Sequence, residues 1–95
     1  MDIKITKSEG VYTAVIPELH IVDQADTISE LRSNLRDAIE LTVEYILERG
    51  SIEEISKLYG LIGKELNKKE RNNISDVISE VLAKKVLSRR LIATA

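Results

Sequence analysis

The stretch Thr27–Glu48, TISELRSNLRDAIELTVEYILE, decides the fold of this 95-residue chain. Seven of its residues recur at steps of three and four, which at 3.6 residues per turn places them on one face of an α-helix. They are Ile28, Leu31, Leu35, Ala38, Ile39, Thr42 and Ile46. Thr27 is a favourable N-cap, and Glu30 three residues later completes a capping box. Arg49 and Gly50 predict a cationic last turn and a left-handed stop.

A helix with a wide apolar stripe needs a flat surface to cover, and the residues before it predict a small sheet. Ile3 and Ile5 alternate with polar neighbours, as in a short half-buried strand. Residues 8–10 (SEG) have turn chemistry, and Val11–Ile16 is rich in β-branched residues. We therefore expect a hairpin whose second strand is central in the sheet.

The second strand ends at Pro17, which cannot donate to a strand ladder. A third strand is expected at His20–Val22 or slightly beyond, and residues 23–26 (DQAD) are expected to form a polar connection into the helix. Short links between strands favour an antiparallel meander. The predicted fold class is therefore α+β, with a three-stranded antiparallel sheet covered by one helix (β-β-β-α) and followed by a helical C-terminal region.

The pattern changes near residue 50, which predicts a module over residues 1–50 and a helical C-terminal region over residues 51–95. Ser51 and Glu54 form a second capping-box pattern, and helical spacing continues to Ile62. Residues 64–73 (KELNKKERNN) are polar and are typical of a linker or a solvated helix. A last helix has an apolar stripe of its own. This stripe consists of Ile74, Val77, Ile78, Val81 and Leu82.

The composition is that of a soluble domain, with 43% hydrophobic and 32% charged residues. Phe, Trp and Cys are absent, so the core must consist of Ile, Leu and Val, and disulfides and thiolate metal sites are excluded. Such a small core is marginal alone, and we expect a homo-oligomer, a dimer or a tetramer. No apolar run reaches the ~20 residues of a membrane span. The first ten residues lack a signal-peptide core, so we expect a cytoplasmic protein with no membrane partner.

The charge is distributed unevenly along the chain. Residues 1–50 hold five Lys/Arg and ten Asp/Glu, a formal charge of −5, whereas residues 51–95 hold nine and six, a charge of +3. An acidic and a basic half suggest two surfaces with different partners. The alternative is that the two halves attract each other.

Three segments of the first half form a specific pattern. A strand bearing Tyr runs into Pro-x-Leu at residues 11–19 (VYTAVIPEL), Asp-Thr opens a helix with Glu three residues on at residues 26–31 (DTISEL), and that helix continues through Leu47. This pattern resembles the HicB-like antitoxin family. The resemblance implies a truncated RNase-H-like module that oligomerises and binds a cognate HicA-like toxin, a small basic ribonuclease. Many such proteins also carry a C-terminal DNA-binding segment and repress their own operon.

Acidic side chains are the candidate binding residues of the first half. A row of helix carboxylates lies opposite the apolar stripe, and two more acids lie near the sheet edge. Such a row is often only a solvated face, but as a binding surface it is complementary to a cationic partner. With the resemblance, the predicted toxin-binding residues are Asp23, Asp26, Asp37, Glu40 and Glu44, and Glu48 continues the row.

Catalysis is not predicted. Two-metal RNA hydrolysis needs several carboxylates that converge from strands and a helix, whereas no acid lies in the middle of a predicted strand and the helix acids face solvent. His20, the only histidine, has no second imidazole for a metal pair and no Ser or Cys arrangement for nucleophilic catalysis. We therefore expect no enzyme activity, no catalytic residue, no metal and no cofactor.

The second half contains a spacing compatible with a helix-turn-helix. The matching residues are Ser56, Gly60, Leu61 and Leu66. The second helix would carry residues suited to phosphate contacts, and the predicted nucleic-acid-binding residues are Lys64, Lys68, Lys69 and Arg71. The alternative is a helical appendage used for dimerisation or for wrapping the toxin. Residues 84–85 (KK) and 89–90 (RR) add a cationic cluster suited to DNA phosphates, a helix C-terminus or the acidic half.

The leading hypothesis is a non-enzymatic antitoxin of a type II toxin-antitoxin pair. It would occlude a basic ribonuclease by charge complementarity and bind operator DNA through its basic half. The alternative is a self-assembling structural or regulatory module that has no toxin partner.

Overall fold

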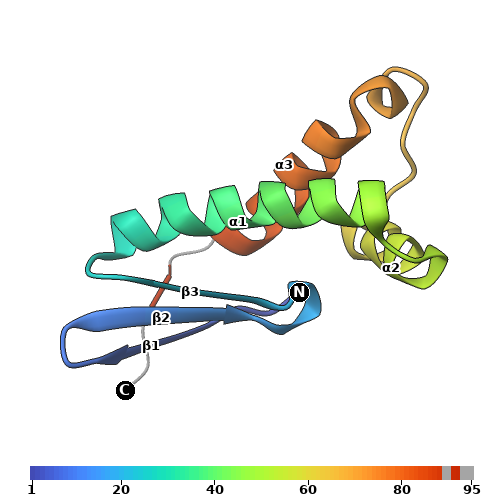
Figure 1. The fold of residues 1–95 in the computed structure, drawn as a ribbon. Helices are drawn as coiled ribbons and strands as arrows, with labels where there is room; N and C mark the ends of the chain where they lie inside the picture. Colours follow the sequence, from blue (N-terminus) through green and yellow to red (C-terminus); the bar gives the residue numbers. More distant parts are fainter. Residues whose placement is uncertain (89–90, 93–95) are drawn as a thin grey trace.

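The computed structural model describes residues 1–88 and 91–92. The chain forms a three-stranded antiparallel sheet followed by helices, an α+β fold as the sequence predicts (Figure 1). The strands are β1 (Lys4–Ser8), β2 (Val11–Ile16) and β3 (Ile21–Ala25), and the helices are α1 (Ile28–Arg49), α2 (Ile52–Ile62) and α3 (Ile74–Leu87). Two short 3-10 turns, η1 (Pro17–Leu19) and η2 (Glu70–Asn73), precede β3 and α3.

The sheet is a meander in which β2 is central, as predicted. The hairpin turn consists of Glu9 and Gly10, whose φ angles of 51° and 78° are both positive. A two-residue turn of this kind matches the right-handed twist of the flanking strands, and it aligns Ser8 with Val11. The turn therefore fixes the register that places Ile5 and Ala14 opposite each other in the core.

The third strand is longer than predicted. Residues 23–25 were expected to form a loop, but they continue β3, where Asp23 pairs with Ala14 and Gln24 with Thr13 of β2. Polar residues are tolerated there because β3 has only β2 as a strand neighbour in the described sheet and Gln24 is exposed. Only residues 26–27 remain as the connection to α1.

Helix α1 begins at the predicted N-cap but without the reciprocal bond of the predicted capping box, and it ends differently. Thr27 is the N-cap, and its hydroxyl accepts from the Glu30 backbone N–H at 3.1 Å. Gly50 was expected to be left-handed, but its φ of −72° and ψ of 157° are extended. Ser51, the next residue, is the N-cap of α2, so residue 50 has an extended backbone that leads directly into the second helix. Glycine is nonetheless required, because a Cβ at residue 50 would lie 2.5 Å from the Ile46 carbonyl oxygen.

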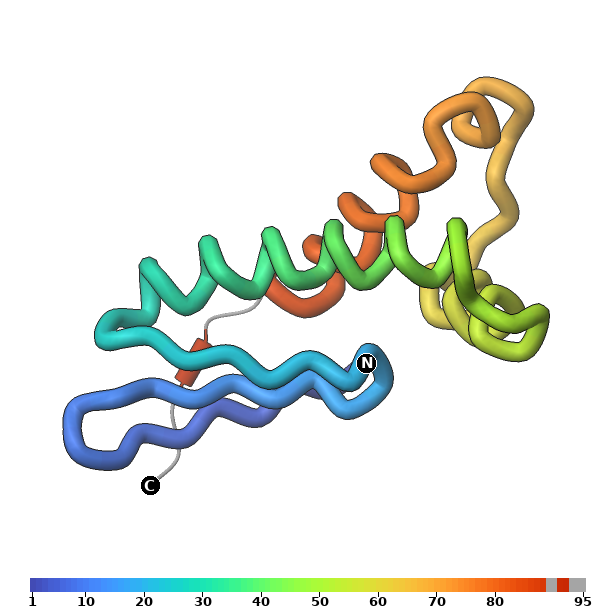
Figure 2. Tube along the Cα trace, in the orientation of Figure 1, coloured from blue at the N-terminus to red at the C-terminus, as the bar shows by residue number. Residues whose placement is uncertain are grey.

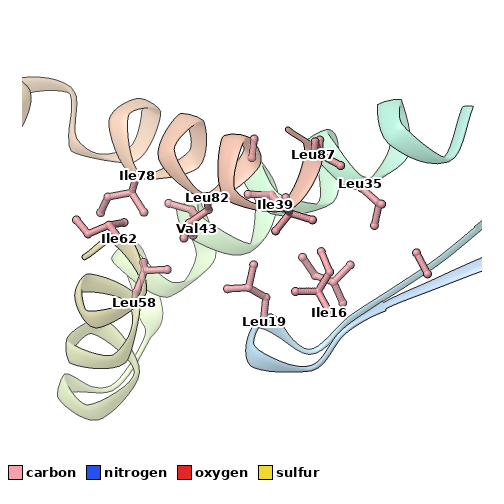
Figure 3. Close-up of a cluster of buried hydrophobic side chains, with 14 of the residues drawn as sticks. Ile16, Leu19, Leu35, Ile39, Val43, Leu58, Ile62, Ile78, Leu82 and Leu87 are labelled. Atoms are coloured by element: carbon pink, nitrogen blue, oxygen red, sulfur yellow. The ribbon is translucent and has the colours of Figure 1, made fainter. Parts of the chain in front are cut away.

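The apolar face of α1 is buried, which confirms the stripe read from the sequence. Leu31, Leu35 and Ile39 are fully buried, and so is Val43, which the predicted stripe omitted. Ile28, Ala38 and Ile46 are partly buried against the same cluster. Figure 3 shows why Val43 belongs to the core: it lies beside Leu82 of α3, so α1 is covered by a helix as well as by the sheet.

The two halves of the chain share one hydrophobic core. Leu58 and Ile62 of α2 and Ile78 and Leu82 of α3 are buried in the same cluster as Leu35 of α1. In Figure 3 the side chains of α1 and α3 point toward α2 on one side and toward the sheet on the other. Residues 51–88 therefore complete the core of the first half.

A polar contact holds the end of α3 against α1. The Nη1 and Nη2 atoms of Arg32 donate to the carbonyl oxygen of Leu87, the last residue of α3, at 2.5 and 2.6 Å. The last carbonyls of a helix have no partner within it and carry partial negative charge. A partly buried guanidinium on α1 therefore satisfies a group that the end of α3 leaves unpaired.

The resulting shape is elongated, with extents of 46 × 23 × 17 Å. Figure 2 shows α1 as the long axis of the molecule, with the sheet beside its first half and α2 at its C-terminal end. The sheet, α2 and α3 pack against the buried side of α1, and within the described part of the chain the opposite side of the helix is exposed.

Candidate binding surface

The outward face of α1 carries a continuous row of carboxylates. This row consists of Asp37, Glu40, Glu44 and Glu48, all of them exposed. Residues three and four apart on a helix are neighbours, so the four side chains form one strip on the surface. We call this strip, together with the exposed apolar residues that border it, the acidic face.

Two large apolar side chains lie within the acidic face. Leu41 is 66% exposed and Tyr45, one turn later, is 60% exposed. Together with Thr42, Glu44, Glu48 and Arg49 they line a shallow hollow on the helix surface. Neither residue is among the binding residues predicted from the sequence. The available signal was their position outside the apolar stripe, since an aromatic and a leucine on the solvent side of an amphipathic helix have no core to fill.

The carboxylates of the acidic face form no ion pair with the described residues of the basic half. In the part of the chain that the structure describes, the ion pairs within 4 Å are Lys64–Glu70 at 2.7 Å and Lys84–Glu80 at 3.6 Å. Both pairs lie within residues 51–88. Among the described residues, no direct ion pair therefore joins the acidic half to the basic half.

The two remaining predicted acids lie elsewhere. Asp23 is half-buried in β3, where its Oδ1 accepts from the Gln24 backbone N–H at 2.9 Å, and Asp26 is exposed just before α1. At 1.5 Å per residue, Thr27 and Glu44 are separated by about 25 Å along the helix axis. The structure thus brings Asp37, Glu40 and Glu44 together but does not bring Asp23 and Asp26 into the same strip.

His20 lies in a small pocket at the other side of the molecule. It adopts a left-handed conformation with φ of 54° at the end of η1. The pocket encloses about 90 Å³, has an apolar floor that includes Leu19 and Leu58, and has Glu54 at its rim. The pKa of Glu54 is held below its ordinary value, mainly because the Ser51 backbone N–H donates to the carboxylate and to a smaller extent because of His20. No group of three acidic or imidazole side chains in residues 1–88 and 91–92 is arranged to hold a metal ion.

The predicted second helix of a helix-turn-helix is wrong. Gly63, with φ of 66°, ends α2 in a left-handed conformation, and residues 64–69 form no helix. A local clamp then fixes the loop: Asn67 and Glu70 exchange hydrogen bonds between backbone and side chain at 2.8 and 3.1 Å, and Lys64 pairs with Glu70. These bonds give the backbone N–H groups of Asn67 and Glu70 hydrogen-bond partners without a helix, and the predicted recognition helix does not form.

The basic residues of this region are distributed over a loop. Lys68, Lys69 and Arg71 are exposed on the loop and on η2, and we call these three residues the basic loop. Lys64 already pairs with a carboxylate. Contact of these residues with nucleic acid stays a prediction. Of the C-terminal cationic cluster, Lys84 pairs with Glu80 and Lys85 is exposed, whereas residues 89–90 lie outside the described residues.

Comparisons with known proteins give no assignment. Neither the family models, nor the curated proteins, nor the solved structures yielded a match to this chain. Among the residues that the structure describes, none of the helices combines the length and the apolar character needed to cross a bilayer.

Proposed function

We propose that this chain is a non-enzymatic binding protein that docks a cationic protein on the acidic face of α1. The observation that carries the proposal is the placement of two exposed apolar side chains, Leu41 and Tyr45, beside a strip of carboxylates that have no cationic partner among the described residues. Such a surface combines a charged field with apolar anchors.

The two parts of the surface have separate physical roles. Carboxylates on one side of a helix steer a basic partner during encounter and raise the association rate. Tyr45 and Leu41 then lose water against the partner, and a buried tyrosine at the centre of an interface contributes about 2 kcal/mol or more. The helix backbone, fixed by the core beneath it, needs no reorganisation on binding.

The partner class follows from the same charges together with the resemblance of residues 11–47 to HicB-like antitoxins. We infer that the partner is a HicA-like toxin, a small basic ribonuclease, and that the chain acts by covering the RNA-binding surface of that enzyme. The basic residues with which the toxin contacts RNA phosphates would contact the acidic face of this chain instead, so the bound chain would exclude RNA from the toxin. Binding of operator DNA through the basic loop is a separate extension of this proposal.

The test uses the protein encoded by a short reading frame next to the gene of this chain. The two proteins are mixed, and the Kd is measured by calorimetry for the wild type and for Tyr45→Ala. A loss of about 2 kcal/mol corresponds to roughly 30-fold weaker binding. Ile52→Ala is the matched control, because Ile52 is 86% exposed but lies at the start of α2, outside the acidic face.

Three outcomes would contradict the proposal. The neighbouring protein does not bind, or it binds with a Kd that Tyr45→Ala leaves unchanged, or Tyr45→Ala abolishes self-association of the chain and nothing else. The last result would support the alternative of a self-assembling module, and light scattering of the isolated variants distinguishes it from loss of partner binding.

A further inference from the structure

A groove between α1 and α3 contains a second group of polar residues that the proposed function has not used. Its lining consists of Arg36 and Glu40 from α1 and of Asp76, Ser79, Glu80 and Ala83 from α3. The groove holds about 250 Å³ of open space. This is less than the ~300–1,000 Å³ of pockets that bind drug-sized molecules, so it suits a single side chain.

Ser79 is the unusual residue of the groove. It is 5% exposed and is the one polar side chain among the buried residues of the described chain. Its neighbours Ile78 and Leu82 are fully buried in the core. No described residue forms a hydrogen bond with the Ser79 hydroxyl. Every fully enclosed polar side-chain atom of the described chain does have a hydrogen-bond partner, so the Ser79 hydroxyl is not fully enclosed. It therefore faces the open groove that Ser79 lines. A hydroxyl that opens onto a groove can accept a hydrogen bond from a ligand, and alanine at this position would offer no such acceptor.

The charge of the groove is negative. Three carboxylates, those of Glu40, Asp76 and Glu80, face one guanidinium, that of Arg36. Within the described residues Glu40 and Asp76 have no ion pair closer than 4 Å, and Glu80 has only an exposed pair with Lys84 at 3.6 Å. The groove therefore attracts a cation. A metal ion is not favoured, since no three acidic side chains here are arranged to hold one.

We propose that the groove accepts the guanidinium of an arginine from the docked cationic partner, an inference that rests on the proposed function. A guanidinium carries five donors in a planar fork. It can therefore donate to the neutral Ser79 hydroxyl at the floor and to carboxylates of both helices at the rim. Glu40 belongs both to the acidic face and to the groove, so an arginine seated here would be continuous with a partner docked on α1.

The groove is tested on the isolated full-length chain with the peptide acetyl-Gly-Arg-Gly-amide. Backbone amide shifts of the ¹⁵N-labelled protein are followed during titration, first with this peptide and then with the same peptide carrying citrulline, a neutral isostere of arginine. The expected result is a saturable shift at Glu40, Asp76, Ser79 and Glu80 with the arginine peptide only. Shifts of equal size with citrulline, or shifts spread evenly over all exposed acids, would overturn the inference.

Variants separate the groove from general electrostatics. Ser79→Ala removes the acceptor, and Asp76→Asn removes a rim charge. Loss of a hydrogen bond to a charged group predicts roughly 10-fold weaker peptide binding for Ser79→Ala. Glu53→Gln is the matched control, because it removes an exposed acid of α2 that neither lines the groove nor belongs to the acidic face. Thermal melts show that each variant folds, and Ser79→Ala is expected to be at least as stable as the wild type.

The same variants distinguish failure of the inference from failure of the proposed function. If the partner protein binds and Tyr45→Ala weakens it but Ser79→Ala and Asp76→Asn do not, the groove is not an arginine site and the acidic face remains the docking surface. If the arginine peptide binds in the groove while the partner protein is indifferent to Tyr45→Ala, the guanidinium site stands and the docking proposal fails.

Discussion

Replacement of Arg32 by alanine is the sharpest test of how the C-terminal helix is held. The guanidinium donates from two nitrogens to the Leu87 carbonyl oxygen and lies, partly buried, at the C-terminal end of α3. Hydrogen bonds from a charged group contribute about 1.5–3 kcal/mol, and a cation at a helix C-terminus about 0.3–1 kcal/mol. These contributions overlap, because the same charge makes both. We therefore expect Arg32→Ala to lower the free energy of unfolding by about 2 kcal/mol.

The assay is urea unfolding followed by circular dichroism, with a thermal melt as a second readout. For a domain of 60–100 residues, 1 kcal/mol corresponds to about 4–8 °C in Tm, so a decrease of about 8–16 °C is expected. Arg32→Lys should retain only part of the stability, because an ammonium cannot donate from two nitrogens in one plane. Arg36→Ala, an exposed position one turn later, is the control and should change the free energy of unfolding by less than about 0.5 kcal/mol. If Arg32→Ala and Arg36→Ala were equally stable, the contact with Leu87 would contribute nothing and this reasoning would be refuted.

Two further predictions concern the charged groups of the second half. The pKa of Glu54 lies below its ordinary 4.5 in the folded state, so its capping bond with Ser51 stabilises the protein at neutral pH and is lost as the pH falls below 4.5 through the folded-state pKa. The stability advantage of the wild type over Glu54→Gln in urea unfolding should therefore decrease as the pH is lowered below 4.5. An advantage that stayed constant across this acid range would contradict the assignment. We expect the wild type to bind DNA from upstream of the gene with an affinity that falls steeply with salt concentration, and reversal of the three charges of the basic loop should abolish this binding. If a gel shift at low salt detects no complex with the wild type, the DNA-binding extension is wrong and the docking proposal is unaffected.

The elements that the sequence predicts well are those whose signals are local. The stripe of α1, the N-cap at Thr27 and the capping box at Ser51 depend on spacings of three and four residues, and the structure contains all of them. The Glu9-Gly10 turn likewise needs only the two residues that adopt positive φ. Each of these features can be read without knowing what packs against it.

The features that the sequence analysis missed depend on contacts between distant segments. Val43 lies on the flank of the α1 stripe and becomes core only because α3 returns to cover it. The end of α1 could not be predicted from the presence of glycine, since Gly50 is required for a close approach to Ile46 rather than for a left-handed turn. The second helix of the candidate helix-turn-helix does not form after Gly63, because the polar residues there pair with one another instead of continuing a helix.

Some residues of the candidate site could likewise be predicted from local sequence signals, and others could not. The carboxylates of α1 were predicted because they alternate with the apolar stripe, and the structure confirms that they are exposed. Tyr45 and Leu41 could have been noticed as apolar residues on the polar face. Ser79 could not, because nothing in its sequence context shows that it is buried at α1 with an open groove in front of its hydroxyl.

The footprint of the bound partner on this chain is the most direct test of the proposal that α1 binds through its outward face. The ¹⁵N-labelled full chain is titrated with the unlabelled neighbouring gene product, and the loss or shift of each backbone amide signal is recorded. We predict that the changes concentrate on residues 37–48 and extend to Ser79, while β1 and the basic loop are unaffected. Changes confined to the sheet or to the basic loop, with residues 37–48 undisturbed, would contradict it.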